Sequence, residues 1–344
     1  MVAIVQNRAG PATRRLVPGL ALAVALATLA TVVGTVLPVV GGPVTGVVLG
    51  VVVAAIRKPG PMLVPGIGFA SKVVLQLSVV VLGAQLSVAE VLRVGVASLP
   101  VLLGTLAACL VGAFWIGRWL GIVGKLRTLV GVGTGICGAS AIAAVTSVIG
   151  AAEVEVSYAI STIFVFNIAA VLAFPMIGHV LGLGQHAFGL FAGTAVNDMS
   201  SVVATATTYG SSAANHAVVV KLTRTLLVIP ICLGLAALQN RAMPTPTALR
   251  SRPRAWRLVP VFLVGFVLVA AANSVGLIPA GAHRPLGLVA GFLITVALSA
   301  VGLSTDFGGL RRTGPRPLVL GAILWVLVSV TSLGLQFATG GAAA

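Results

Sequence analysis

Charged residues are scarce in this chain. Asp, Glu, Lys and Arg make up 8% of its 344 residues, whereas soluble domains contain about 25%. Only five residues are acidic, and hydrophobic residues account for 58% of the chain. The mean hydropathy is +1.16, and the apolar residues gather in long blocks between short polar segments. This pattern excludes a soluble globular protein and predicts a polytopic α-helical membrane protein.

Cysteine and histidine are also few. The three cysteines lie in separate apolar blocks without a CxxC pair, and no HExxH motif is present. The sequence therefore predicts no disulfide framework, no metal and no cofactor. An intramembrane enzyme would need a partner for Cys137, but we expect His179 and His186 in a cytoplasmic loop, His216 near the outer surface and His283 in an outer loop. We therefore expect a protein that is not an enzyme.

The chain also lacks the aromatic platforms of nucleic-acid-binding proteins. Its formal net charge is +16, but the basic residues form small clusters between apolar blocks. Membrane topology explains these clusters better than nucleic acid does. We therefore expect the lipid bilayer as a partner and no nucleic acid.

Eleven apolar stretches approach the length of about 20 residues that a membrane-spanning helix needs. Their apolar character on all faces favours helices over the alternating strands of a barrel. With a cytoplasmic N-terminus, only Arg93 and Arg284 fall in outer loops, and sixteen basic residues fall on the cytoplasmic side. This distribution follows the positive-inside rule and predicts eleven helices with the C-terminus outside. The cytoplasmic set comprises Arg8, Arg14, Arg15, Arg57, Lys58, Arg118, Lys125, Arg127, Arg241, Arg250, Arg252, Arg254, Arg257, Arg311, Arg312 and Arg316.

Three ionisable residues are predicted inside the membrane, where charge is costly and usually functional. Asp198 in the seventh stretch and Arg224 in the eighth each lie about ten residues from the outer end, near the midplane. Lys221 precedes Arg224 by three residues, which places both cations on one helix face. One carboxylate cannot neutralise two cations, so the surplus favours an anion between the helices. The alternative is a structural Asp198–Arg224 ion pair, with Lys221 reaching outward to the membrane surface.

Two glycine-rich polar segments match each other without a gap. They are GTGICGASAIAA at 133–144, in the fifth stretch, and GTAVNDMSSVVA at 193–204, in the seventh. Glycines at positions 133, 135 and 138 weaken a helix, so we expect the fifth stretch to be broken. Broken helices at membrane depth survive where they line a cavity, and their N-termini attract anions. The alternative is close helix packing through small residues.

These segments resemble the YeiH-type family of bacterial membrane proteins, which carry the name sulfate exporters. The resemblance covers nearly the whole chain. It rests on the two segments above, on KLTRTLLVIP from Lys221 and on GLSTDFGGLRRTGPRPL from Gly302. The resemblance implies a histidine where Asn197 stands, and this difference argues against proton shuttling at that position.

The resemblance implies a fold related to sodium/proton antiporters and bile-acid symporters, with inverted five-helix repeats and two discontinuous crossing helices. We therefore expect a single transmembrane transporter domain over 1–344, located in the bacterial inner membrane. Its expected parts are a cytoplasmic tail at 1–16, an extra helix at 17–37, repeats at 43–178 and 187–338, and a basic cytoplasmic loop at 239–257. The fifth and tenth stretches would form the crossing pair.

The sequence thus predicts a secondary transporter that exports a small anion, either sulfate or an organic sulfonate, by alternating access. Proton or sodium would be the coupling ion, and homo-oligomerisation stays open. A cation/proton antiporter that uses Asp198 as its ion-binding carboxylate is the alternative. The expected substrate-binding residues are Thr134, Cys137, Gly138, Ser140, Asn197, Asp198, Lys221 and Arg224, with Asp198 also providing the coupling charge.

Overall fold

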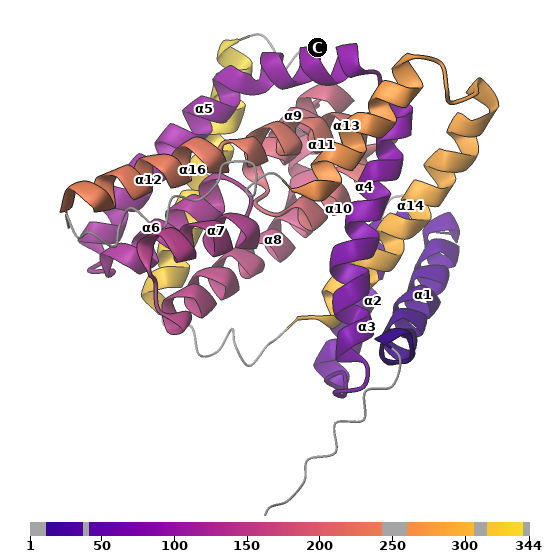
Figure 1. The fold of residues 1–344 in the computed structure, drawn as a ribbon, viewed down its shortest axis with the longest axis horizontal. Coiled ribbons are helices and arrows are strands. Elements are labelled where there is room, and N and C mark those ends of the chain that lie inside the picture. Colours follow the sequence, from indigo (N-terminus) through magenta and orange to yellow (C-terminus); the bar gives the residue numbers. More distant parts are fainter. Residues whose placement is uncertain (1–11, 37–40, 243–259, 306–314, 340–344) are drawn as a thin grey trace, which may run out of the picture. The chain divides into compact units, whose positions relative to one another are not determined.

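The structure is a computed structural model that describes residues 12–36, 41–242, 260–305 and 315–339. Seven of the helices in this part of the chain are long and apolar enough to cross a membrane, and three shorter apolar helices accompany them. The elements, of which Figure 1 labels the α-helices, are α1 (Ala12–Val36), α2 (Gly41–Ile56), α3 (Val64–Phe69), η1 (Ala70–Val74), α4 (Leu75–Leu82), η2 (Gly83–Gln85), α5 (Val88–Trp119), α6 (Gly124–Gly135), α7 (Ala139–Ile149), α8 (Glu153–Val180), α9 (Gln185–Ala195), α10 (Met199–Tyr209), α11 (Ser211–Leu226), α12 (Val228–Ala242), α13 (Val261–Ser274), α14 (Ala280–Leu303) and α16 (Pro315–Ala338).

The chain divides into two compact units. The smaller unit covers residues 1–78 and 288–306. It contains α1, α2, α3, η1, the first half of α4 and most of α14. Small residues let its helices pack closely: a Cβ atom added to Gly50 of α2 would collide with the carbonyl oxygen of Ser299 in α14. The described residues of this smaller unit thus pack tightly as a helical bundle, as small residues allow in membranes.

The larger unit covers residues 79–287 and 307–344 and holds the candidate site. Its long helix α5 begins at the cap residue Ser87, whose side chain accepts a hydrogen bond from the backbone N–H of Glu90. An aromatic cluster links three helices, because Phe174 of α8 stacks on Trp325 of α16 at 5.2 Å and lies 4.6 Å from Phe191 of α9. The main hydrophobic core surrounds this cluster and the two glycine-rich polar segments.

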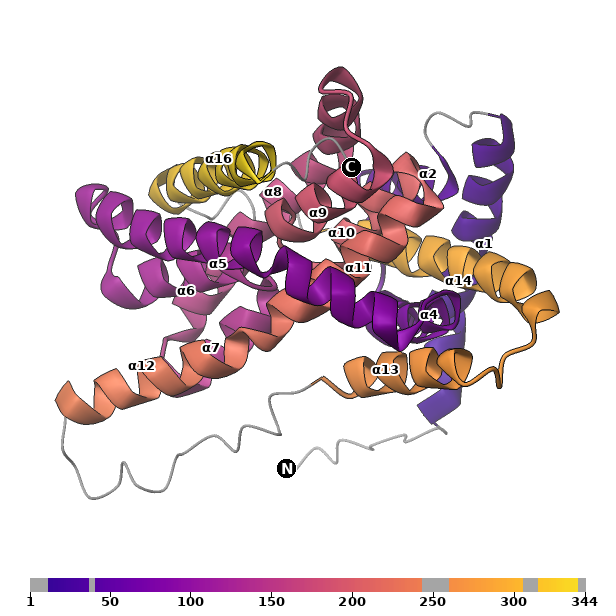
Figure 2. The same cartoon turned by 90° about the horizontal axis from the view of Figure 1, so that it is seen from above.

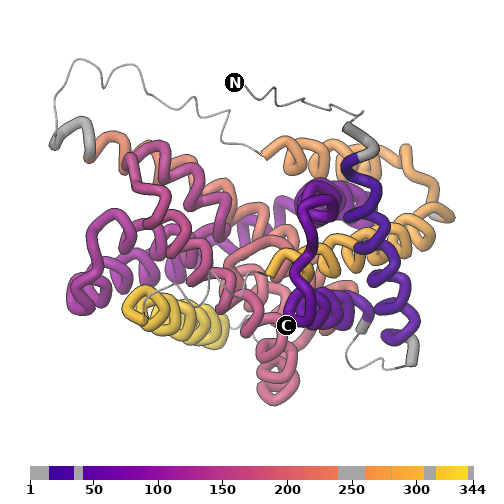
Figure 3. The backbone as a smooth tube through the Cα atoms, turned by 90° about the horizontal axis from the view of Figure 1, so that it is seen from below, coloured from indigo at the N-terminus to yellow at the C-terminus, as the bar shows by residue number. Residues whose placement is uncertain are grey.

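The fifth predicted stretch folds back on itself. α6 ends at Gly135 and α7 begins at Ala139, so the predicted break in this segment is confirmed. The Lys125 ammonium at the start of α6 donates a 2.8 Å hydrogen bond to the carbonyl oxygen of Gly150, just after α7. The start of α6 and the end of α7 therefore lie side by side, and the two helices form a re-entrant hairpin, here called hairpin 1. Figures 2 and 3 show the backbone path through this region.

The seventh predicted stretch is a second re-entrant hairpin, hairpin 2, made of α9 and α10. The Tyr209 hydroxyl at the end of α10 donates to the carbonyl oxygen of Leu183, just before α9. The Gln185 side chain at the start of α9 accepts a hydrogen bond from the backbone N–H of Ala213. Since the 28 residues of α8 separate the two hairpins along the chain, hairpin 1 starts and ends near one end of α8 and hairpin 2 near the other.

These hairpins correct the expectation of eleven crossings. Each of the two segments returns to the side from which it came, so neither spans the bilayer. Glu153 then lies on the side of Lys125 rather than opposite to it, and His186 lies on the side of His216, with the two rings in contact. The charge rule missed this arrangement because the loops between the affected segments contain no Lys or Arg.

The expected crossing pair is also corrected. The tenth stretch is the unbroken helix α14, whereas the two interruptions lie in the fifth and seventh stretches. The boundaries expected for the two repeats, 43–178 and 187–338, stay a prediction. The predicted basic loop at 239–257 includes the end of α12 up to Ala242, and its remainder lies outside the described residues, as do residues 1–11 of the predicted tail.

Candidate functional site

The tip of hairpin 1 is a short non-helical connection between α6 and α7. Ile136 leaves helical geometry with φ −124° and ψ −89°. Gly138 follows with φ +66° and ψ −131°, a conformation that essentially only glycine adopts without strain. The sequence Gly135–Ile136–Cys137–Gly138 therefore breaks the helix because Gly138 supplies a backbone geometry closed to other residues.

The tip of hairpin 2 is held by its own carboxylate. Asp198 is the N-cap of α10 and accepts hydrogen bonds from the backbone N–H groups of Ser200 and Ser201, at 3.1 and 3.2 Å. The hydroxyl groups of the same two serines also donate to it. A capping carboxylate neutralises the positive end of a helix. The N-terminus of α10 is thus both bonded and electrically compensated.

The two hairpins correspond residue by residue. α6 and α9 end at Gly135 and Ala195, and α7 and α10 begin at Ala139 and Met199, in the register of the sequence match. If both stretches crossed in the same direction, as the sequence predicts, this match would be parallel and unrelated to an inverted repeat. Since the hairpins start near opposite ends of α8, the match instead relates two oppositely directed hairpins.

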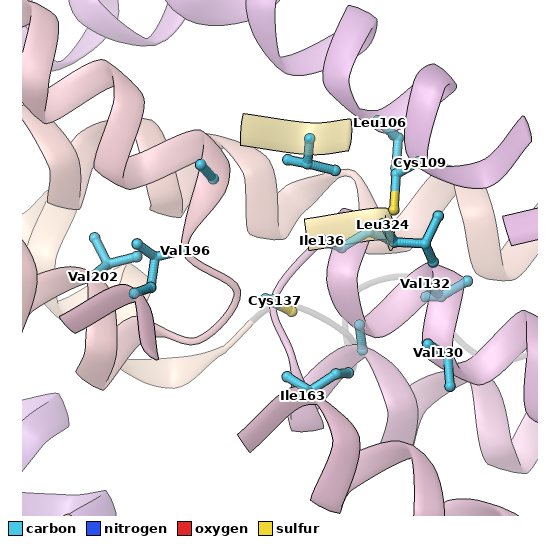
Figure 4. Packing of buried hydrophobic residues seen from close by; sticks show 14 of the residues in the cluster. Leu106, Cys109, Val130, Val132, Ile136, Cys137, Ile163, Val196, Val202 and Leu324 are labelled. Carbon is cyan, nitrogen blue, oxygen red and sulfur yellow. The ribbon is translucent and has the colours of Figure 1, made fainter. Parts of the chain in front are cut away.

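The two tips touch. A Cβ atom placed on Gly138 would lie 3.2 Å from the Cβ of Asp198. These residues occupy equivalent positions in the two hairpins, so Asp198 gives the N-terminus of α10 a carboxylate cap, whereas its counterpart Gly138 at α7 has no side chain. Figure 4 shows Ile136 and Cys137 on one connecting loop and Val196 on the other. The pair of tips is therefore asymmetric in charge although similar in backbone.

Two cations on α11 join the tips. The Lys221 ammonium donates to the carbonyl oxygens of Ile136 at 2.9 Å and Val196 at 2.7 Å, which are equivalent positions in the two hairpins. The Arg224 guanidinium donates to the carbonyl oxygens of Gly135 at 2.8 Å and Thr134 at 3.0 Å. Both side chains are 0% exposed. They satisfy the carbonyl groups that the broken helices leave unpaired.

This geometry corrects the predicted partners of the charged residues. No ion pair between described residues joins Asp198 to Arg224 or to Lys221, because the carboxylate bonds to its own helix and the cations bond to carbonyl oxygens. The alternative in which Lys221 reaches outward is also wrong, since its side chain is fully buried. Asp198, Lys221 and Arg224 all lie at the hairpin tips, as expected, but the two cations contact backbone carbonyl groups of the tips instead of the carboxylate.

The remaining predicted residues also lie at the tips. Thr134 is buried and contributes its carbonyl oxygen to Arg224. Cys137 is 8% exposed in the connecting loop, whereas Ser140 is exposed in the first turn of α7. Asn197 is 1% exposed, and its Oδ1 atom has no hydrogen-bond partner. Of these three neutral polar residues, Thr134, Ser140 and Asn197, Ser140 is the exposed one.

Sequence reasoning missed two elements of the site. Asn167, in the middle of α8, accepts a 3.2 Å hydrogen bond from the backbone N–H of Asn197 and so holds the tip of hairpin 2. Its signal was an isolated amide in a long apolar helix. The hydroxyl oxygens of Thr194 in α9 and Ser332 in α16 lie 2.6 Å apart. Serine in an apolar stretch is too common to mark this contact from sequence.

The charges at the tips leave a positive surplus. Each helix end carries about half a unit charge, so the negative ends of α6 and α9 offset the positive ends of α7 and α10. Asp198 offsets one of the two buried cations. With Lys221 protonated, about one positive charge then remains at a centre where the N-terminus of α7 has no capping carboxylate. This arrangement favours an anion over a cation.

Comparison with known proteins shows extended similarity. The family described as "Conserved hypothetical protein 698" matches residues 18–321. A "UPF0324 membrane protein" of Streptococcus pyogenes serotype M3 is 41% identical over 282 residues, which cover 80% of this chain and 83% of the relative. Proteins with the same name from Streptococcus mutans and Streptococcus pneumoniae are 41% and 42% identical, with the same coverage of both chains.

Proposed function

This chain belongs to the Conserved hypothetical protein 698 family, whose relatives carry the name UPF0324 membrane protein, and we propose that it is a secondary transporter of a small anion. The anion binds where the two hairpin tips meet. Lys221 and Arg224 set the positive potential of this centre from behind the tips. The protein acts as a transporter rather than an enzyme, in the inner membrane of a bacterium.

The observation that carries the proposal is that the N-terminus of α7 has no capping carboxylate and lies in front of two buried cations. Ala139 and Ser140 in its first turn are exposed, and the N-cap residue Gly138 has no side chain. Backbone N–H groups at a free helix N-terminus bind anions. The Ser140 hydroxyl adds a further donor, and the cations behind the tips raise the affinity through the charge surplus.

Hairpins directed from opposite sides suit alternating access. A tip that withdraws with its hairpin opens the site toward the side from which that hairpin enters, and the other hairpin keeps the opposite side closed. Lys221 bonds to both tips, so it holds the tips together and must release one of them when a hairpin withdraws. Outward transport, which the resemblance implies, then requires hairpin 1 to open toward the cytoplasm for loading.

The substrate class follows from the charge and from the resemblance. A surplus of about one positive charge suits a singly charged anion, such as an organic sulfonate, better than doubly charged sulfate. Cation/proton antiport through Asp198 is disfavoured, because four hydrogen bonds within the first turn of α10 already occupy its oxygens. Proton or sodium stays the expected coupling ion.

The test compares two aspartate substitutions on one helix. Ser140→Asp places a carboxylate in the first turn of α7, where it neutralises the N-terminus from within. Ser147→Asp is the matched control, because Ser147 is also exposed but lies in the last turns of α7. Purified protein is screened by thermal shift against sulfate, sulfite, thiosulfate, sulfonates and carboxylates, with pH and sodium varied. Proteoliposome flux of the stabilising anions follows.

We expect anion-dependent stabilisation and flux in the wild type and in Ser147→Asp, and neither in Ser140→Asp. The unfolding temperature without anion serves as the folding control for both variants. Equal anion binding in the two variants, or no response of the wild type to any of these anions, would refute the proposal.

A further inference from the structure

One face of α11 changes from polar to apolar along its length. Asn215 and His216, in its second turn, line a polar cavity of about 180 Å³. Further along the helix, Leu222 and Leu226 line an apolar groove of about 300 Å³. Val219 lines both, and the spacing of three and four residues places this series on one helix face. The cavity and the groove therefore meet end to end along α11.

The facing helix α5 shows the same order. Glu90, in its first turn, lines the polar cavity, and Gly95 and Leu99 line the groove further along. The groove also contains Leu92 and Val96, whose side chains are 62% and 64% exposed. Because α5 is one of the helices long and apolar enough to cross a membrane, lipid chains rather than water reach this groove.

The carboxylate of Glu90 is available to a ligand. It is half-buried, and no cation in the described part of the chain forms an ion pair with it. The two histidines of the cavity, His186 and His216, hydrogen-bond to each other, with their Nδ1 atoms 3.3 Å apart. A carboxylate that is partly removed from water and has no partner favours a cationic group beside it.

A positive charge follows the carboxylate along α5. Arg93 lies three residues after Glu90, which is about 4.5 Å further along the helix axis. It is exposed, and it acts electrostatically on His216 of the same cavity. From the start of α5 inward, the seam between α5 and α11 thus presents a negative charge, a positive charge and then an apolar groove.

This order is the reverse complement of a phospholipid that carries an amine. We propose that the seam between α5 and α11 binds phosphatidylethanolamine, with its ammonium group at Glu90, its phosphate at Arg93 and one acyl chain in the groove. Two carbon atoms and one oxygen atom separate nitrogen from phosphorus in this headgroup, which suits the spacing of the two side chains. A primary ammonium group also donates charge-assisted hydrogen bonds to a carboxylate.

The experiment is native mass spectrometry of the purified, delipidated full-length protein in detergent. It is titrated with phosphatidylethanolamine or phosphatidylglycerol of identical acyl chains. We expect one phosphatidylethanolamine per chain, bound at least fivefold more tightly than phosphatidylglycerol, whose headgroup has no amine. Glu90→Gln should abolish this preference. Glu153→Gln is the matched control and should keep it, because Glu153 is also acidic in the first turn of a long helix but does not line this cavity.

Two further measurements separate the parts of the site. Arg93→Gln should weaken the binding of both lipids severalfold, because both contain the phosphate. Glycerophosphoethanolamine, which has the headgroup without acyl chains, should bind at least tenfold more weakly than the lipid, because it leaves the groove unfilled. Thermal unfolding without lipid verifies that each variant is folded.

Equal affinity of the wild type for the two lipids indicates a non-selective lipid shell and overturns the proposal. An unchanged preference in a folded Glu90→Gln variant overturns it as well, as does equal binding of glycerophosphoethanolamine and the intact lipid. A second protein chain that displaces the lipid would identify the groove as a dimer interface and refute it too. Lipid binding is measured without any anion, so failure of the proposed transport function leaves this test unaffected.

Discussion

Replacing Asp198 by asparagine removes one negative charge from the tips while keeping a residue type that caps helices equally well. The asparagine side chain can still accept the N–H groups of Ser200 and Ser201, so α10 should keep its start. Asp198 adjoins Gly138 at the N-terminus of α7. An anion bound to the N–H groups of α7 would therefore lie roughly 6–8 Å from the carboxylate.

The size of the effect follows from this separation. At an effective dielectric constant of about 20–40, repulsion between two unit charges about 7 Å apart is about 1–2.5 kcal/mol. Asp198 is partly exposed, which favours the lower part of this range. Removing the charge should lower the anion dissociation constant by roughly fivefold to tenfold at the lower energy.

The assay is anion titration of purified wild type and Asp198→Asn, with the anion that stabilises the wild type most. Tighter binding and slower release are expected, so flux at saturating anion should fall while the affinity rises. Loss of anion binding in a folded Asp198→Asn variant would refute the reasoning. Cation-stimulated proton release that disappears in this variant would instead support the antiporter alternative.

The remaining predictions concern the hairpins. Single cysteines introduced at Glu153 and Leu181 should react from the cytoplasmic and outer sides respectively, as measured with an impermeant thiol reagent in oriented cells; the eleven-helix topology requires the reverse. Gly138→Ala should lower the free energy of unfolding by about 1–3 kcal/mol, because alanine does not adopt this backbone geometry without strain. The added Cβ atom would also press against Asp198, which should separate the tips and expose Cys137 to labelling. Gly150→Ala is the control, because its positive φ has the ordinary left-handed geometry and no atom lies within 4 Å of the added Cβ; its cost should be about 1 kcal/mol. Equal unfolding temperatures and equal labelling in the two alanine variants would contradict the role of Gly138.

The break in the fifth stretch was predictable because it has a local cause. Glycines at 133, 135 and 138 weaken the helix wherever it lies in the molecule. Gly138 adds a conformation that the chain can adopt without help from its surroundings. The break in the seventh stretch was not predicted, although Asp198 caps a new helix better than it fits inside one.

The direction of the segments was not predictable from the sequence. A stretch of about 23 residues can cross the bilayer once or turn at its middle, and both folds bury the same apolar residues. The basic residues could not separate these folds, because the loops that change sides contain none. Contacts far apart in the chain decided the matter, from Lys125 to Gly150 and from His186 to His216.

The sequence by itself determined that this is a helical membrane protein, because that depends on composition. Local spacing also predicted a surplus of basic over acidic side chains near the middle of the membrane. Only the tertiary structure decided what the charges contact. Lys221 and Arg224 face carbonyl oxygens of two hairpin tips rather than Asp198. A buried cation bonds to the acceptors that the fold brings to it. Every residue has a backbone carbonyl group, so the sequence does not show which of these groups a broken helix leaves without a partner.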